Sequence, residues 1–183
     1  MENPYVRCPV FETDHFILRL IRPDDTEELL RCYSDPQAQK IFNADNCTGD
    51  FHMHTAAEMG ECVAAWIRAY EQEEYVRFAI VAKALDKAVG TVEMFGMVGV
   101  YQSPVGILRL DICSEYERKA FLDELFALCV NEFFPLFGVE QILHKTVPAA
   151  DERVQVLEKY GFQPCEIPER AHYWGLGREE CHL

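Results

Sequence analysis

The spacing of hydrophobic residues predicts a strand, a helix, a second strand and a second helix in the C-terminal half of the chain. Over 106–112 the apolar residues fall on every second position, which is typical of a β-strand. Over 114–134 they recur at intervals of three and four, which is typical of a helix with one apolar face. The two patterns then repeat, as a strand over 141–147 and a helix over 151–160.

The ends of these helices also carry recognisable signals. Ser114 with Glu117, and Thr55 with Glu58, fit the pattern in which a hydroxyl and a carboxylate satisfy free N–H groups at a helix start. Both pairs are therefore predicted to open a helix. Gly161 suits the left-handed residue that ends the last helix.

The remaining segments complete an α/β pattern in what reads as a single domain over residues 1–183. We expect a lead-in arm over 1–14 and a tail over 177–183, and the two prolines at 164 and 168 predict a loop. Neither an internal repeat nor a convincing linker interrupts the chain. The other expected elements are a strand over 15–21, a helix from 23, a helix from 55 to 70, strands over 75–82 and 89–98, and a last strand over 171–176.

Composition places the chain among ordinary soluble proteins. Hydrophobic residues make up 49% of it and charged residues 26%. Its longest apolar runs fall short of a bilayer span, and its first residues lack the basic and apolar regions of a signal peptide, so we expect a cytoplasmic protein that binds no membrane. None of the eight cysteines forms a C-x-x-C pair, which favours reduced thiols over a disulfide framework.

The charge balance narrows the choice of partners. With 31 acidic against 17 basic residues, the formal charge is −14. Such a chain lacks the basic footprint of a nucleic-acid-binding protein, and we expect no nucleic-acid partner. The negative charge is compatible with a cationic acceptor, such as an amine or a basic protein tail, although solubility alone would also account for it.

Three motifs of this chain resemble those of the GNAT acetyltransferases and occur in the same order along the chain. The resemblance is closest to the branch that acetylates ribosomal-protein N-termini. Leu157–Phe162 reads L-E-K-Y-G-F, near the closing motif of the family, and Arg19–Asp25 reads R-L-I-R-P-D-D, near its opening motif. Tyr33–Pro36 stands at the usual distance between them, so the resemblance covers about residues 15–165. It implies a mixed, mostly antiparallel central sheet with helices on both faces.

The resemblance also implies an activity and its co-substrate. Family members transfer an acetyl group from acetyl-CoA to a primary amine, here of a small molecule or a protein N-terminus, without a metal. The implied cofactor contacts are the main chain of Leu110, Ile112 and Cys113, together with Ala150 at the position of a family asparagine. A monomer or a homodimer would suit this activity.

One family motif is replaced. The helix start that binds the CoA pyrophosphate reads Q/R-x-x-G-x-G/A in the family but Glu117-Arg118-Lys119-Ala120-Phe121-Leu122 here. Glu117 brings a negative charge toward the anion site, where like charges ~4 Å apart cost about 1 kcal/mol in water and about 4 at a protein surface. Arg118 and Lys119 either reach the phosphates from the side or face solvent. The departure supports a second hypothesis, a catalytically inactive binding or regulatory module.

Candidate catalytic groups follow from the same resemblance. Glu93, beside the expected centre of the sheet, is the candidate general base, and Asp111 is the alternative. The family tyrosine that protonates the thiolate is replaced by Leu157, so Tyr160 is the candidate acid. The competing interpretations are an ordinary solvated strand glutamate for Glu93 and a core tyrosine with a satisfied hydroxyl for Tyr160.

Two further groups of residues are of types that bind metals or act as nucleophiles. His52 and His54, with Cys47 and Glu58 nearby, form an isolated H-x-H in a loop, which is poor support for a metal, and none is predicted. Cys113 stands at a strand end, where a nucleophile would need a base beside it. The sequence places no such base there and favours a small core thiol.

Overall fold

The computed structural model describes residues 3–45, 47, 49, 51–97 and 104–180. They form an eight-stranded sheet in the order β1-β2-β3-β4-β5-β6-β8-β7, in which only the β5–β6 pair is parallel. The fold class predicted from the sequence is confirmed. The strands are β1 (Phe11–Glu12), β2 (Phe16–Leu20), β3 (Val76–Ala82), β4 (Lys87–Met97), β5 (Val105–Ile112), β6 (Gln141–Lys145), β7 (Gln163–Ile167) and β8 (Arg170–Gly177).

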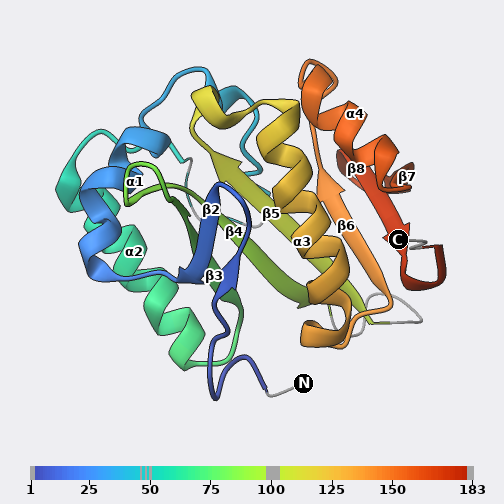
Figure 1. Ribbon diagram of the computed structural model, residues 1–183, viewed down its shortest axis with the longest axis horizontal. Coiled ribbons are helices and arrows are strands. Elements are labelled where there is room, and N and C mark those ends of the chain that lie inside the picture. The colour runs from blue at the N-terminus through green and yellow to red at the C-terminus, as the bar shows by residue number, and fades with distance from the viewer. Residues whose placement is uncertain (1–2, 46, 48, 50, 98–103, 181–183) are drawn as a thin grey trace.

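Helices cover both faces of this sheet (Figure 1). α1 (Thr26–Tyr33) and α2 (Ala56–Glu71) pack on one face, against the odd-numbered side chains of β3. α3 (Lys119–Phe137) and α4 (Asp151–Lys159) pack on the other face, over the main hydrophobic core. Short 3₁₀ turns occupy Pro23–Asp25, Ala38–Lys40, Ser114–Tyr116 and Arg178–Glu180.

The sheet opens between β5 and β6. These strands pair from Val105 with Gln141 as far as Leu108 with His144, and the register stops there. On its other side β5 stays paired with β4 until Gly90 meets Ile112. The last four residues of β5 therefore keep one unpaired main-chain edge, which faces the first turn of α4.

The start of α3 differs from the prediction. Ser114–Tyr116 forms a 3₁₀ turn, and the α-helix begins only at Lys119, with Arg118 at the N-cap and no side-chain cap. The predicted Ser114–Glu117 capping box is therefore wrong, because the Glu117 carboxylate is bound by an arginine of α4 instead. The Thr55–Glu58 box is confirmed, since Glu58 N–H donates to Thr55 Oγ1 at 3.2 Å.

Two segments expected to lack regular structure contain strands. The predicted loop around Pro164 forms β7, which pairs with β8 at the edge of the sheet. A proline is tolerated there because an edge strand leaves one side of its main chain unpaired. The predicted lead-in arm contains β1, which pairs with β2 through Phe11 and Leu18.

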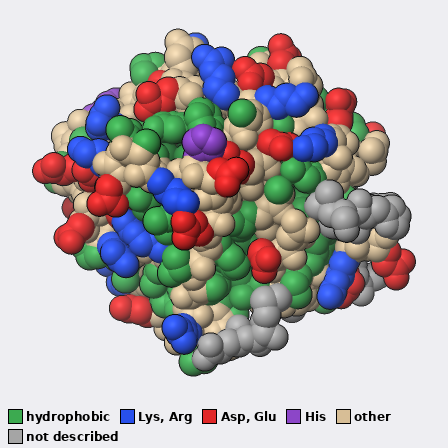
Figure 2. Space-filling view, viewed as in Figure 1, with side chains coloured by type: hydrophobic (Ala, Val, Ile, Leu, Met, Phe, Trp, Pro, Cys, Tyr) green, Lys and Arg blue, Asp and Glu red, His purple; other side chains and the backbone are tan. Residues whose placement is uncertain are grey.

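The outer surface carries charges of both signs. Figure 2 shows acidic and basic side chains interspersed on the face that α3 covers. Nowhere in the described residues does a helix combine the length and the apolar character that crossing a membrane requires. Within the same residues, His, Cys, Asp and Glu side chains do not gather in groups of three that could hold a metal ion.

Candidate active site

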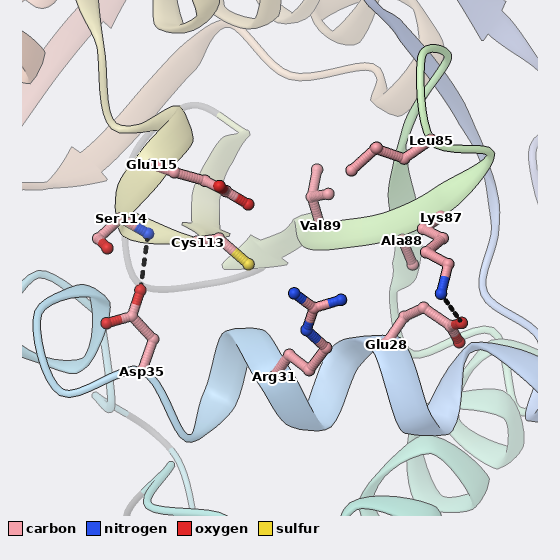
Figure 3. Close-up of a pocket in the computed structure, with 10 residues that line it drawn as sticks. All are labelled: Glu28, Arg31, Asp35, Leu85, Lys87, Ala88, Val89, Cys113, Ser114 and Glu115. Carbon is pink, nitrogen blue, oxygen red and sulfur yellow. Dashed lines mark hydrogen bonds and ion pairs between the residues drawn. The ribbon is translucent and has the colours of Figure 1, made fainter.

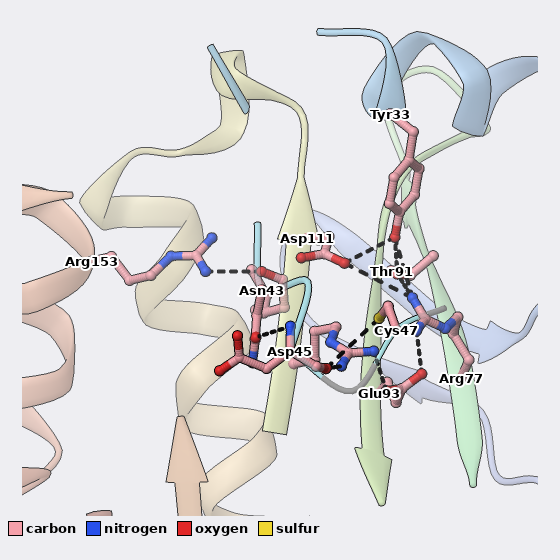
Figure 4. A network of polar contacts seen from close by, with 11 residues as sticks. Tyr33, Asn43, Asp45, Cys47, Arg77, Thr91, Glu93, Asp111 and Arg153 are labelled. Carbon is pink, nitrogen blue, oxygen red and sulfur yellow. Dashed lines mark hydrogen bonds and ion pairs between the residues drawn. The ribbon is translucent and has the colours of Figure 1, made fainter. Parts of the chain in front are cut away.

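A row of three charged residues crosses the sheet on the face covered by α2. In the register of these strands, Arg77 on β3 lies opposite Glu93 on β4 (Figure 4). Glu93 in turn lies opposite Arg109 on β5. Arg109 Nη1 donates to Glu93 Oε1 at 2.8 Å, and Arg77 Nη2 donates to Glu93 Oε2. The three residues are 1 to 5% exposed. One buried carboxylate thus holds two guanidinium groups, an arrangement that directional charge-assisted bonds keep in place.

A second polar row lies one step along the same strands. Thr91 on β4 faces Asp111 on β5, and Tyr33 reaches both from α1, with its hydroxyl 2.8 Å from Thr91 Oγ1 and 3.1 Å from Asp111 Oδ2. Burial raises the pKa of Asp111, while Arg109, Arg77 and Arg153 act in the opposite direction. This carboxyl group is fully buried, and its Oδ2 lies 3.9 Å from Arg77 Nη1 of the first row.

The first row forms one wall of a cavity of about 530 Å³. Its other walls are largely aromatic, and the Arg77 guanidinium lies 3.9 Å from the centroid of the Trp66 ring. Apolar walls with a few fixed polar groups are typical of sites for small organic ligands. The lining side chains include Phe51, Met53, Cys62, Trp66, Tyr75 and Phe95.

On the opposite side of β5, one arginine fills the opening between β5 and β6. Arg153, from the first turn of α4, donates through Nη1 to the Leu110 carbonyl at 2.8 Å. Its Nε and Nη2 donate to the two oxygens of Glu117 at 2.7 and 2.6 Å. Arg153 is 1% exposed. Its guanidinium therefore uses an acceptor on the unpaired edge of β5 and has its charge balanced by Glu117.

The N-terminus of α3 is also occupied by α4. The main-chain N–H of Lys119 donates to Glu152 Oε2, and Arg118 Nη1 lies 3.3 Å from Glu152 Oε1. The Lys119 N–H is the main reason that the pKa of Glu152 is lowered. Lys119 Nζ reaches Gln155 at 3.5 Å. A carboxylate of the chain thus takes the position that an anion commonly takes at a helix start.

A smaller cavity lies between α1 and the end of β5. It has a volume of about 240 Å³, and Cys113, Arg31 and Glu115 are among its lining residues (Figure 3). Asp35 on the α1 side accepts the Ser114 N–H at 2.9 Å and so ties the two segments together. The pKa of Cys113 is lowered, chiefly because the thiol of Cys32 donates to it.

Comparison with known proteins identifies the family of this fold and site. The model of the acetyltransferase (GNAT) domain matches residues 15–163. The chain belongs to the GNAT acetyltransferase family. A curated relative, the uncharacterized N-acetyltransferase YoaA of Bacillus subtilis, is 22% identical over 155 residues, which cover 85% of this chain and 83% of that protein.

Solved structures share the GNAT fold at low sequence identity. The ribosomal-protein-S5-alanine acetyltransferase of Vibrio fischeri superposes with a TM-score of 0.71 and 15% identity, covering 96% of this chain and all of that one. RimJ of Mycobacterium smegmatis, solved in complex with CoA-disulfide, gives a TM-score of 0.70 and 13% identity, covering 90% of this chain and 83% of that one. Ribosomal-protein acetyltransferases are thus among the structures that have this fold.

The two predicted catalytic residues of this GNAT domain lie apart. Glu93 is in the wall of the aromatic cavity, on the face of the sheet that α2 covers. Tyr160 packs in the core on the opposite face, where its hydroxyl donates to the Asp123 carbonyl at 3.2 Å. The sheet lies between them, and the hydroxyl of Tyr160 is satisfied, as the core interpretation of this residue expected.

The predicted cofactor contacts fall into three groups. The main chain of Leu110 and Ile112 lies at the unpaired edge of β5, and Cys113 follows directly. Arg118, Lys119 and Ala120 stand at the start of α3, whereas the next two side chains point into the protein. The remaining positions are Phe121, packed on Phe16 and Tyr116, Leu122, which is fully buried, and Ala150, the buried N-cap of α4.

Sequence reasoning missed the four charged residues that dominate the site. Arg77 is the one charged residue of the otherwise apolar strand β3, and Arg109 lies in a largely apolar β5. A charged residue in such a strand is the signal that could have marked both as buried partners of Glu93. Glu152 and Arg153 lie in the first turn of α4, and their contacts depend on where that helix packs, which no local pattern indicates.

The residues on the donor side do not fit a CoA pyrophosphate in this conformation. Glu152 accepts the main-chain N–H of Lys119, and Arg153 donates to the carbonyl of Leu110. Glu117, which binds Arg153, is a second carboxylate in this region. Two carboxylates at the start of α3 repel a diphosphate. The aromatic cavity lies on the other face of the sheet, so these contacts do not fill it.

Proposed function

We propose that this protein is an N-acetyltransferase that uses acetyl-CoA to acetylate a primary amine of a small molecule or of a protein N-terminus. The observation that carries the proposal is the aromatic cavity beside β5, with the Glu93 carboxylate in its wall, in a chain of the GNAT family. Acetyl transfer to an amine needs the two reactants held together and a group that takes the amine proton.

Glu93 is the residue we assign to the amine proton. A carboxylate offers about four lone-pair positions, and Arg77 and Arg109 use one on each oxygen of Glu93. The remaining positions are available to an ammonium N–H that enters the cavity. The two guanidinium groups also fix the carboxylate in one orientation, which favours a defined approach of the amine.

The setting of the reaction is part of the same proposal. A chain with a formal charge of −14 attracts cationic acceptors through its overall field, so amines that carry a second positive charge are the first to test. We expect a cytoplasmic enzyme that works as a monomer or a homodimer. The role of Tyr160 as an acid stays a prediction. Its hydroxyl donates to the Asp123 carbonyl in α3, so it would have to leave this contact to protonate a thiolate.

The test is acetyl transfer measured by mass spectrometry. Purified protein is incubated with acetyl-CoA and three kinds of amine, namely an arylalkylamine, a polyamine and a peptide with a free N-terminus. We expect one class to gain an acetyl group, and Glu93→Gln to slow that reaction by about a hundredfold or more. Glu158→Gln, an exposed change on α4, is the control. No transfer to any amine at millimolar acetyl-CoA would contradict the proposal.

A second function is favoured by the closed donor side. The contacts of Glu152 and Arg153 would also suit a binding or regulatory module that has lost the donor. A thermal-shift titration separates the two functions, because a ligand at a hundredfold excess over its Kd stabilises the native state by about 2.7 kcal/mol. An unchanged melting temperature at millimolar CoA favours the module.

A further inference from the structure

We propose that the first turn of α4 is a built-in occupant of the donor site, in which Glu152 and Arg153 hold the groups that acetyl-CoA must use. The inference rests on acetyl-CoA being the donor. It adds that the free chain is closed to that donor, and that opening requires these two side chains to leave α3 and β5. We call these two residues the latch.

Glu152 is the anionic half of the latch. Its carboxylate accepts the first main-chain N–H of α3 and lies 3.3 Å from Arg118 Nη1. A phosphate group at a helix start would bind through the same main-chain N–H and the same guanidinium. The carboxylate and a phosphate therefore compete for one set of donors, and both cannot be bound there at once.

Arg153 is the cationic half of the latch. It makes three hydrogen bonds and is 1% exposed, so its guanidinium fills the opening at the unpaired edge of β5. Arg153 occupies the Leu110 carbonyl, which lies on the unpaired edge of β5. An extended ligand with amide groups, such as acetyl-CoA, would hydrogen-bond to this edge as a neighbouring strand does. Glu117 compensates the charge of Arg153, and a buried pair of this kind is costly to break by removing one partner.

The two halves are adjacent residues, which makes the latch a single unit. Both project from the first turn of a nine-residue helix whose N-cap, Ala150, makes no side-chain capping bond. The side chain of Glu152 is 39% exposed, so solvent can hydrate its carboxylate when it leaves α3. When it leaves, Arg118 and the Lys119 N–H lose a negative partner and become available to the diphosphate.

The experiment measures CoA binding by isothermal titration calorimetry in matched variants. Glu152→Ala removes the anionic half, and Glu117→Gln combined with Arg153→Ser removes both members of the buried pair, so that no unpaired charge is left inside. Glu158→Ala is the control, because it removes one negative charge from the exposed far end of the same helix. Melting temperatures check that each variant is folded, and Glu152→Ala suffices if the double variant is not.

We expect Glu152→Ala and the double variant to bind CoA about tenfold more tightly than the wild type, with Glu158→Ala unchanged. Equal affinity in all four proteins, an equal gain in Glu158→Ala, or no binding in any variant would overturn the latch. Tighter binding without acetyl transfer would uphold the latch and reject the proposed function. If the wild type transfers acetyl groups and the variants bind CoA with the same affinity as the wild type, the proposed function is upheld and the latch is rejected.

Discussion

Arg109 Nη1 lies 2.8 Å from Glu93 Oε1, while Arg77 binds the other oxygen of the same carboxylate. Among the described residues, Glu93 is the carboxylate that hydrogen-bonds to both buried guanidinium groups, and Asp111 Oδ2 forms a second ion pair with Arg77 Nη1 at 3.9 Å. Removing the Glu93 charge leaves Arg109 without an ion-pair partner among the described residues, and breaking a buried pair in this way typically costs about 3–5 kcal/mol. We predict that Glu93→Gln lowers the free energy of unfolding by that amount, as measured by urea denaturation.

The control for this prediction is Glu158→Gln, since an exposed surface change usually stays within about 0.5 kcal/mol. A Glu93→Gln variant as stable as the wild type would mean that the two arginines do not need this carboxylate. Because the prediction concerns stability, turnover of this variant should be compared at a temperature at which both proteins are folded.

Gly90 on β4 lies opposite Ile112 on β5. A methyl group added at Gly90 would lie 2.7 Å from the Ile112 Cα, and it would also clash with the Asp111 carbonyl, so the backbone of β5 would have to shift. We predict that Gly90→Ala destabilises the protein by at least about 1–3 kcal/mol in urea denaturation, as overpacking does.

Gly60 is the matched control for that substitution. It lies inside α2, where an added methyl group would meet only Thr26 Cγ2 at the ordinary contact distance of 3.7 Å. Gly60→Ala should stabilise the protein by about 0.5–1 kcal/mol, because alanine restricts the unfolded chain and favours a helix. Equal effects of the two substitutions would contradict the close packing of β4 on β5.

Much of the fold could be predicted from the chain because its signals are local. The alternation over β5 and the Thr55–Glu58 box each depend on residues within one element, and both were recognised. β7 was missed because Pro164 marks a loop unless the strand is known to lie at an edge, which is a property of the whole sheet. The Ser114–Glu117 box failed for a similar reason, since Arg153 from α4 competes for the carboxylate.

The site was harder to predict than the fold because its contacts join distant segments. Glu93 was chosen from its strand, but its partners depend on the register that brings β3 and β5 to either side of it. Tyr160 was chosen by its distance from a replaced family residue, and the position of α4 directs its hydroxyl to Asp123 instead. The missing glycines at the start of α3 predicted a changed anion site, although not which side chain would fill it.

Cys113 should be a more reactive thiol than Cys62. A hydrogen bond from Cys32 lowers the pKa of Cys113, whereas burial raises the pKa of Cys62 to about 11. Because the thiolate is the nucleophile, we predict that iodoacetamide at neutral pH labels Cys113 before Cys62, as read by peptide mass spectrometry. Cys113 also lines an open cavity, which gives the reagent access.

A substitution at Cys32 tests the cause of that reactivity. Cys32→Ala removes the donor and should slow the labelling of Cys113, while Cys32→Ser keeps a donor and should preserve it. Labelling that is equally fast in both variants would show that the hydrogen bond does not control the thiolate. Labelling of Cys62 before Cys113 in the wild type would reject the prediction altogether.

His144 should make the stability of the protein fall in mild acid. Burial, together with the nearby charge of Arg153, lowers the pKa of His144 from its ordinary value of 6.5 to about 3, and its Nδ1 lies 2.9 Å from the Leu108 carbonyl. The unfolded chain takes up a proton here below pH 6.5, but the folded chain does not until about pH 3. Protonation therefore favours unfolding between these two pH values. Each pH unit of acidification in this window should lower the free energy of unfolding by about 1.4 kcal/mol through His144 alone. His144→Gln should flatten the curve by one proton, whereas His52→Gln, at an exposed position, should keep the wild-type slope. An unchanged slope in His144→Gln would mean that this ring takes up its proton equally well in both states.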